Sequence, residues 1–128
     1  MKYYTSLIIL VLFFSACKSS IKPESLYGKW NYTRIKSNIT RPDSITAARL
    51  KVGSPYIEFT QKDSLFIYWS GGRISRGIFT TDGDSIVYKE DIDYGTRVFP
   101  FIVTELTDKK IVFYTKGAEG SEVTAVKQ

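Results

Sequence analysis

Residues 56–88 read YIEFTQKDSLFIYWSGGRISRGIFTTDGDSIVY. Apolar and polar residues alternate in short runs that turn residues separate, which is the pattern of antiparallel strands joined by hairpins. Asp82-Gly83 and Gly71-Gly72 are two-residue hairpin signals, because they supply the positive φ that such turns require. A third turn is expected at Lys62-Asp63. The stretch therefore predicts four consecutive strands, over residues 56–61, 64–69, 73–80 and 85–90.

The three turns also determine which residues share a face of the sheet. Residues that lie opposite each other across a hairpin point to the same side, and a slip of one residue would exchange the two faces. The first turn pairs Phe59 with Phe66, and the third pairs Phe79 with Ile86. All three turns agree on one face, which is expected to be the interior: Ile57, Phe59, Phe66, Tyr68, Gly77, Phe79, Ile86 and Tyr88.

The opposite face of the same hairpins is also apolar. The apolar residues expected to point outward are Leu65, Ile67, Trp69, Ile74, Ile78 and Val87, of which the first four form the stripe expected to be a contact surface. A contiguous apolar stripe on the outside of a soluble protein is typical of a contact surface. Either Ile45 and Leu50 of a short helix cover this stripe, or it meets a partner protein, a second copy or a membrane.

The same alternation continues on both sides of the opening stretch. Four further strands are expected, over residues 27–36, 96–106, 110–116 and 122–127, so the chain predicts an eight-stranded all-β sandwich or barrel. Residues 42–50 break the rhythm and predict a short helix that follows the first strand and ends near Gly53.

The strand over residues 96–106 does not fit a simple alternation. Counting back from a turn at residues 108–109 pairs Thr104 with Phe113 and leaves Phe101 and Val103 on the other face. Pro100 indicates an edge or a bulge within this strand, because proline cannot donate to a ladder.

The first residues have the layout of an export signal. A short basic start that contains Lys2 precedes the apolar run LIILVLFF at residues 7–14, and the small residues Ser15 and Ala16 follow. The run is too short to span a bilayer, which takes about 20 apolar residues. Residues 1–16 are therefore expected to be a signal peptide.

Phe14-Ser15-Ala16-Cys17 resembles the lipobox of bacterial lipoproteins. The resemblance implies that Cys17 becomes the acylated first residue, with the protein anchored to the outer membrane on its periplasmic face or at the cell surface. Cys17 is also the only cysteine, and a lone cysteine in an exported chain needs a role other than an intramolecular disulfide. Residues 17–24 would form the lipidated N-terminus and tether, and residues 25–128 the folded domain.

The charge of the chain does not suggest nucleic-acid binding. Loss of residues 1–16 removes Lys2 and leaves 17 basic against 13 acidic residues, a net charge of +4. These basic residues are scattered along the chain, whereas nucleic-acid binding usually needs a clustered basic face.

Leu26-Tyr27-Gly28-Lys29-Trp30 resembles the first strand of lipocalin-like domains, with glycine and tryptophan two residues apart. Later segments such as Tyr56-Ile57-Glu58-Phe59 and 106–113 are similar to successive strands of small lipocalin-like lipoproteins of the Bacteroidetes. The resemblance implies an antiparallel up-and-down barrel of about eight strands. It also implies a barrel base at Gly28 and Trp30, with Lys127 over the tryptophan.

Residues suited to catalysis are scarce. The chain has no histidine, which removes histidine-based triads, histidine metal sites and the usual acid–base residue at neutral pH. The acidic run 90–93 lacks calcium-loop spacing and predicts a solvated loop. The protein is expected not to be an enzyme and to need no cofactor or metal.

Two functions remain. The barrel could hold a small apolar ligand, lined by Trp30 together with Ile57, Phe59, Phe66, Tyr68, Phe79, Ile86, Tyr88 and Phe113. Alternatively its own side chains fill it. The barrel would then be a dry scaffold, acting as an interaction or inhibitor module through Leu65, Ile67, Trp69 and Ile74.

Overall fold

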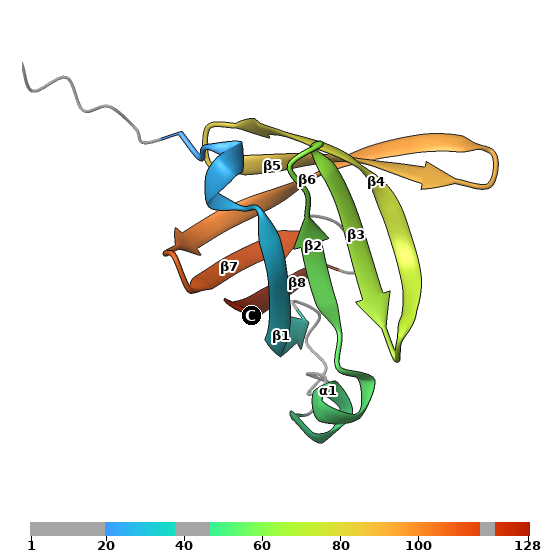
Figure 1. The fold of residues 1–128 in the computed structure, drawn as a ribbon, viewed down its shortest axis with the longest axis vertical. Coiled ribbons are helices and arrows are strands. Elements are labelled where there is room, and N and C mark those ends of the chain that lie inside the picture. Colours follow the sequence, from blue (N-terminus) through green and yellow to red (C-terminus); the bar gives the residue numbers. More distant parts are fainter. Residues whose placement is uncertain (1–19, 38–46, 116–119) are drawn as a thin grey trace, which may run out of the picture.

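The computed structural model describes residues 20–37, 47–115 and 120–128, and its strands form one closed antiparallel barrel (Figure 1). Each strand pairs with the next along the chain, and β8 pairs with β1 to close the barrel. The expected all-β up-and-down barrel with one short helix is confirmed. The strands are β1 (Gly28–Ser37), β2 (Tyr56–Phe59), β3 (Ser64–Trp69), β4 (Gly72–Asp82), β5 (Ser85–Ile92), β6 (Gly95–Leu106), β7 (Lys110–Thr115) and β8 (Ser121–Lys127).

Two helical segments accompany the strands. The 3-10 helix η1 (Pro23–Ser25) precedes β1, and α1 (Ala47–Gly53) lies between β1 and β2. The helix ends at Gly53 as expected, and residues 42–46 of the expected helix, with Ile45, lie outside the described residues. Among the residues that the structure describes, no helix is both long and apolar enough to cross a membrane.

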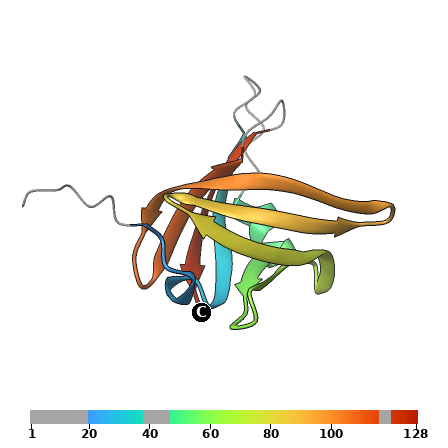
Figure 2. The same ribbon diagram turned by 90° about the horizontal axis from the view of Figure 1, so that it is seen from above.

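The two ends of the barrel differ. η1 and the β2–β3, β4–β5 and β6–β7 turns lie at one end, here called the closed end. α1 and the β3–β4 and β5–β6 turns lie at the other, here called the open end. The β5–β6 hairpin extends far beyond the rest of the barrel, on the side opposite η1, in both views (Figures 1 and 2).

The expected register of β3 is wrong by one residue. Phe59 pairs with Leu65 rather than Phe66, and the Thr60 N–H donates to the Ser64 carbonyl at 2.9 Å. The loop thus has three residues and ends on Asp63 at φ 58°, the left-handed position of a three-residue hairpin loop. Because the loop is one residue longer than expected, Leu65 points into the barrel.

The other two hairpins keep the expected faces of β4 and β5. Their two-residue loops are 70–71 and 83–84 instead of 71–72 and 82–83. A bulge at Ile74 restores the alternation of β4, so that Leu65 pairs with Gly77. Phe79 pairs with Tyr88 rather than Ile86, a shift of two residues that leaves all three side chains inside.

A second bulge explains the irregular strand 96–106. β6 pairs Val103 with Phe113, which corrects the expected pairing of Thr104 with Phe113, and the register shifts across Thr104. The bulge brings Phe101 and Val103 onto the interior face. Among the described residues the β6–β7 ladder ends at the pair Phe101–Thr115, and Pro100 pairs with Val87 of β5.

Candidate functional site

The expected barrel base exists at the closed end. Trp30 is fully buried, and its indole Nε1 donates to the Leu26 carbonyl at 2.7 Å. Lys127 is the register partner of Trp30 on β8, and its Nζ lies 5.0 Å from the indole ring centroid. A Cβ on Gly28 would lie 2.9 Å from Lys127 Cε, so glycine leaves room for the lysine stem. Trp30 and Leu26 plug this end, and Lys127 covers the plug.

Aromatic and aliphatic side chains pack together in the interior above this base. Six of the residues expected to line a ligand site are buried there: Ile57, Phe59, Phe79, Ile86, Tyr88 and Phe113. Their rings contact one another and Phe101: the centroids of Phe59 and Phe79 are 5.1 Å apart, and those of Phe101 and Phe113 are 5.0 Å apart. Rings at these distances pack as a core does, so the described interior is built like a filled small barrel.

Phe66 and Tyr68 are corrections to that expected lining. The three-residue loop before β3 turns both side chains to the outside, where they are half-buried. Tyr68 stacks on Tyr56 with centroids 4.5 Å apart. Arg73 lies 5.4 Å from the ring centroid of Phe66. Lys29 lies 5.6 Å from the ring centroid of Tyr56. These side-chain contacts connect β1, β2, β3 and β4 on the outer surface.

The expected outward stripe is not one surface. Leu65 is fully buried in the core and Ile67 packs against it, so neither can meet a partner at the exterior. Trp69 lies at the open end against α1, where the Ser70 N–H donates to the Gly53 carbonyl at 2.7 Å. Ile74, at the β4 bulge, is the one exposed member of the four. The apolar character of Trp69 is therefore explained by its packing against the helix, and that of Leu65 and Ile67 by their packing in or against the core.

An apolar groove lies between α1 and Trp69. It has a volume of about 310 Å³. A Cβ on Gly53 would come within 2.8 Å of the indole Nε1, so the helix end sits directly on the ring. Val52 is 86% exposed beside it. The lining residues are Ala48, Arg49, Val52, Gly53, Trp69 and Ser70.

A buried polar cluster at the junction of β4, β5 and β6 was not expected from the sequence. Glu90 is nine-tenths buried, and Arg97 Nε donates to its Oε1 at 2.7 Å. Ser75 Oγ donates to the other carboxylate oxygen of Glu90 and lies 2.6 Å from the Tyr88 hydroxyl. Burial, partly offset by the bond to Ser75, raises the pKa of Tyr88 to about 12.

The cluster holds two diverging strands together. The β4–β5 ladder ends at the pair Gly77–Glu90, beyond which β4 pairs only with β3 among the described strands. A Cβ on Gly77 would lie 2.0 Å from the Lys89 carbonyl oxygen, so the two backbones cross closely at this point. The hydrogen bond that joins Ser75 and Tyr88, and the one that Ser75 donates to Glu90, bridge the strands just past the crossing. Glu90 is two residues from Tyr88 and therefore points to the same face of β5. This spacing is the feature of the sequence from which the burial of Glu90 could have been predicted.

The β5–β6 hairpin is the most prominent exposed element. Every residue from Asp91 to Val98 is exposed, and the pair Ile92–Gly95 closes the hairpin around a turn at residues 93–94. Three of these residues are large and apolar: Ile92 is 43%, Val98 61% and Tyr94 101% exposed. No described residue of β7 pairs with β6 before Phe101, so the hairpin projects from the barrel (Figure 2). The acidic run 90–93 belongs to this strand and turn, with Asp91 3.8 Å from Arg76.

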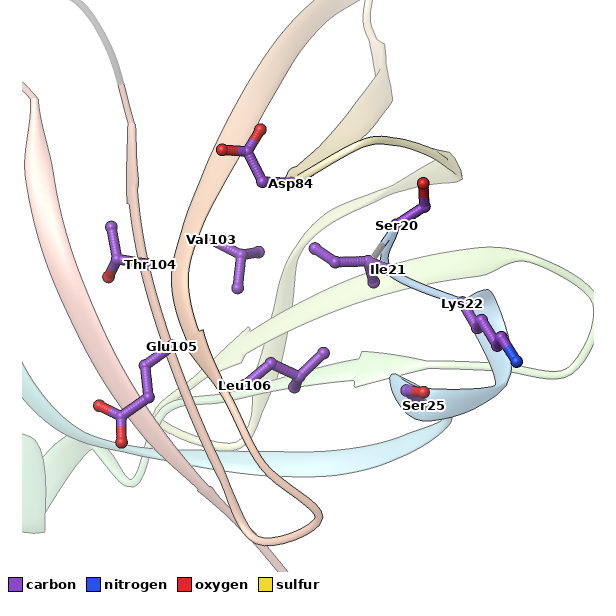
Figure 3. Close-up of a pocket in the computed structure, with 9 residues that line it drawn as sticks. All are labelled: Ser20, Ile21, Lys22, Ser25, Asp84, Val103, Thr104, Glu105 and Leu106. Atoms are coloured by element: carbon purple, nitrogen blue, oxygen red, sulfur yellow. The ribbon is translucent and has the colours of Figure 1, made fainter. Parts of the chain in front are cut away.

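Residues 20–27 form an ordered strap across the closed end. The Ile21 N–H donates to the Gly83 carbonyl at 2.9 Å, and the Ile21 side chain packs against the core. Figure 3 shows Ile21, Val103 and Leu106 pointing toward one another across a groove of about 360 Å³ between the strap and β6. Residues 21–24, assigned from the sequence to the tether, are therefore attached to the barrel.

No protein-family model matches the chain, and no curated protein matches it.

In the part of the chain that the structure describes, no three acidic or cysteine side chains converge in a metal-binding arrangement. The protein class that the fold defines is an eight-stranded up-and-down barrel with a plugged base.

Proposed function

We propose that this protein is a non-catalytic, lipid-anchored cell-envelope protein whose lipocalin-like barrel is a scaffold for binding another protein through the β5–β6 hairpin. The observation that carries the proposal is a contrast between inside and outside. The interior aromatic residues pack against one another, whereas the hairpin exposes Ile92, Tyr94 and Val98. By the register, Val98 lies on the outer face of the hairpin and Ile92 on the opposite face, with Tyr94 in the turn. Exposed apolar side chains on a projecting element are typical of a binding element.

The anchor in this proposal is Cys17, which lies outside the described residues. Its support is the sequence: an apolar export signal, small residues before the cysteine, and no second cysteine. An acyl anchor gains about 0.8 kcal/mol per buried methylene, so two or three chains would hold the protein at the outer membrane. Its periplasmic face or the cell surface is the proposed location.

The hairpin suits a partner because its apolar residues contribute little to the barrel. Val98 lies opposite Lys89 on the outer face, and Tyr94 occupies the turn. Burial of a valine side chain against a partner stabilises a complex by about 1.5 kcal/mol, and tyrosine is enriched among the few residues that dominate an interface. Substitution here should therefore change binding without unfolding the domain.

Photocrosslinking in cells tests this proposal. The photoreactive residue p-benzoylphenylalanine replaces Tyr94 in the full chain, and a protein adduct of one defined mass is expected. Val98→Asp should abolish the adduct, whereas Val126→Asp should not, because Val126 is an exposed valine on β8, away from the hairpin. An adduct twice the mass of the chain would identify a second copy as the partner. No adduct, or one that survives Val98→Asp, would refute the hairpin as the interface.

A small apolar ligand is a second candidate, favoured by the groove between α1 and Trp69 rather than by the packed interior. The groove offers an exposed Val52 beside an indole, which suits a compact apolar molecule. Native mass spectrometry of the chain in detergent should detect a co-purifying mass that Val52→Asp releases. Retention of that mass by Val52→Asp, or its absence from the parent protein, would exclude this groove as the ligand site.

A further inference from the structure

The strap fixes the start of the folded chain at one end of the barrel. Among the described residues, Ile21 is the first with a backbone hydrogen bond to the barrel, through Gly83. Leu26 is fully buried beneath the Trp30 indole, and the Tyr27 hydroxyl donates to Asp63 Oδ1 at 3.1 Å. The chain is therefore attached to the closed end at several points before β1 begins.

Only three residues, Lys18, Ser19 and Ser20, lie between Cys17 and Ile21. Whatever path the chain takes, four residue steps span at most about 14 Å. By contrast, β6 runs for 12 residues from the tip of the hairpin to the closed end, which corresponds to roughly 35–40 Å. The tether is thus much shorter than the molecule is long.

From these lengths we infer that the closed end faces the bilayer surface and that the tip of the β5–β6 hairpin is held away from it. The inference rests on the proposed anchor at Cys17. η1 and the hairpin tip lie on opposite sides of the molecule in both views, so anchoring beside η1 leaves the tip distal (Figures 1 and 2). The exposed Asp91 and Asp93 flanking the tip would also disfavour its approach to an anionic bilayer.

Electrostatic attraction does not account for this orientation. The strap, turns and C-terminal strand end at the closed end carry four lysines and four acidic residues, so their charges cancel. They are Lys22, Lys62, Lys109, Lys127, Glu24, Asp63, Asp84 and Asp108. The short tether is what keeps this surface at the membrane, and the orientation should therefore depend on tether length and little on salt.

The test places p-benzoylphenylalanine at position 109 or 94 of the full lipidated chain, in liposomes that contain a biotinylated phospholipid. Lys109 is exposed in the β6–β7 turn at the closed end, and Tyr94 is exposed at the hairpin tip. Lipid adducts at position 109 should exceed those at position 94 by about tenfold, because the tip lies beyond the reach of the tether.

Insertion of a flexible Gly/Ser linker of about 20 residues between Ser19 and Ser20 provides the control, since its root-mean-square length is roughly 25 Å. The adducts at position 109 should then fall to the level at position 94. Equal adducts at both positions in the parent protein, or more at position 94, would overturn the orientation. Fatty-acid labelling of the same samples separates the two proposals. An unlabelled chain refutes the anchor and the inference with it, whereas a labelled chain with equal adducts refutes the orientation alone.

Discussion

The ammonium group of Lys127 lies 5.0 Å from the ring centroid of Trp30, and the two residues are register partners across the strand pair that closes the barrel. Trp30 is fully buried and Lys127 is half-buried above it. A cation over an indole face contributes about 0.5–2 kcal/mol, depending on how far it is desolvated. The contact between Lys127 and Trp30 therefore joins β8 to β1, where the barrel closes, and also covers the buried indole at the closed end.

Lys127→Met should lower the free energy of unfolding by about 0.5–1 kcal/mol, because methionine keeps the packing over the ring but removes the charge. Trp30→Ala should cost much more, about 3–5 kcal/mol, as a truncation of a large core residue. Urea unfolding followed by circular dichroism measures both. An unchanged midpoint for Lys127→Met would show that the charge adds nothing to the stability of the base.

Gly77→Ala should destabilise the barrel by about 1–3 kcal/mol through overpacking, because the added Cβ would lie 2.0 Å from the Lys89 carbonyl oxygen. Gly72→Ala is the matched control on the same strand, since its nearest neighbour would be at an ordinary 3.7 Å. Thermal unfolding should therefore separate the two variants. Equal melting temperatures would mean that β4 and β5 can move apart at the crossing without cost.

Arg97→Met should be more harmful than Arg76→Met, although both remove an arginine that pairs with a carboxylate. Arg97 binds the buried Glu90 at 2.7 Å, and its loss removes a hydrogen-bond donor from a carboxylate held away from water, at a cost of about 1–3 kcal/mol. Arg76 and Asp91 are 3.8 Å apart and both exposed, and such pairs contribute about 0–1 kcal/mol. Denaturant unfolding of the two variants gives the comparison. The reverse order would contradict a supporting role for the cluster.

The sequence was sufficient for the architecture because the turn signals and the alternation act together over eight strands. It failed at three single-residue features. The left-handed Asp63 lengthens one loop, and the bulges at Ile74 and Thr104 each shift a register by one residue. Each such shift exchanges the faces of a strand, which is why Leu65 was expected outside and Phe66 inside. Hydrophobicity could not decide between them, because both faces of β3 are apolar.

The functional elements were harder to predict than the fold. The Glu90 cluster depends on where β4 leaves β5, which is set by the close crossing at Gly77 and not by any local pattern. The projecting hairpin likewise depends on which part of β6 is paired: the described residues of β7 pair with β6 only from Phe101 onward. Strand length and pairing partners are properties of the closed barrel, so alternation within a single strand does not reveal them. By contrast, Gly28, Trp30 and Lys127 were predicted because residues 26–30 resemble the first strand of lipocalin-like domains, a resemblance that implies a basic residue of the last strand over the tryptophan.

Cys17→Ala should leave a precursor that incorporates no fatty acid and keeps its signal peptide, because the thiol is the proposed site of acylation. Metabolic labelling with palmitate, followed by mass measurement of the purified chain, tests this. Ser19→Ala is a suitable control, since it changes a nearby residue of the tether and should be labelled normally. Labelling of Cys17→Ala at the level of the parent chain would end the lipoprotein assignment.

The stability of the domain should fall as the pH rises from about 10 toward 12. Burial raises the pKa of Tyr88 from its ordinary value near 10 to about 12, and burial also raises the pKa of Tyr32. Between these values the unfolded chain has lost the Tyr88 proton and the folded chain still holds it, so rising pH favours unfolding. The contribution is complete below pH 10 and disappears as the pH passes through the folded pKa. Tyr88→Phe should flatten this decline, whereas Tyr94→Phe, at a fully exposed position, should not. Urea unfolding between pH 9 and about 12, combined with tyrosinate absorbance, measures both effects. An identical pH dependence in the parent protein and Tyr88→Phe would show that the buried hydroxyl is not held in its neutral form.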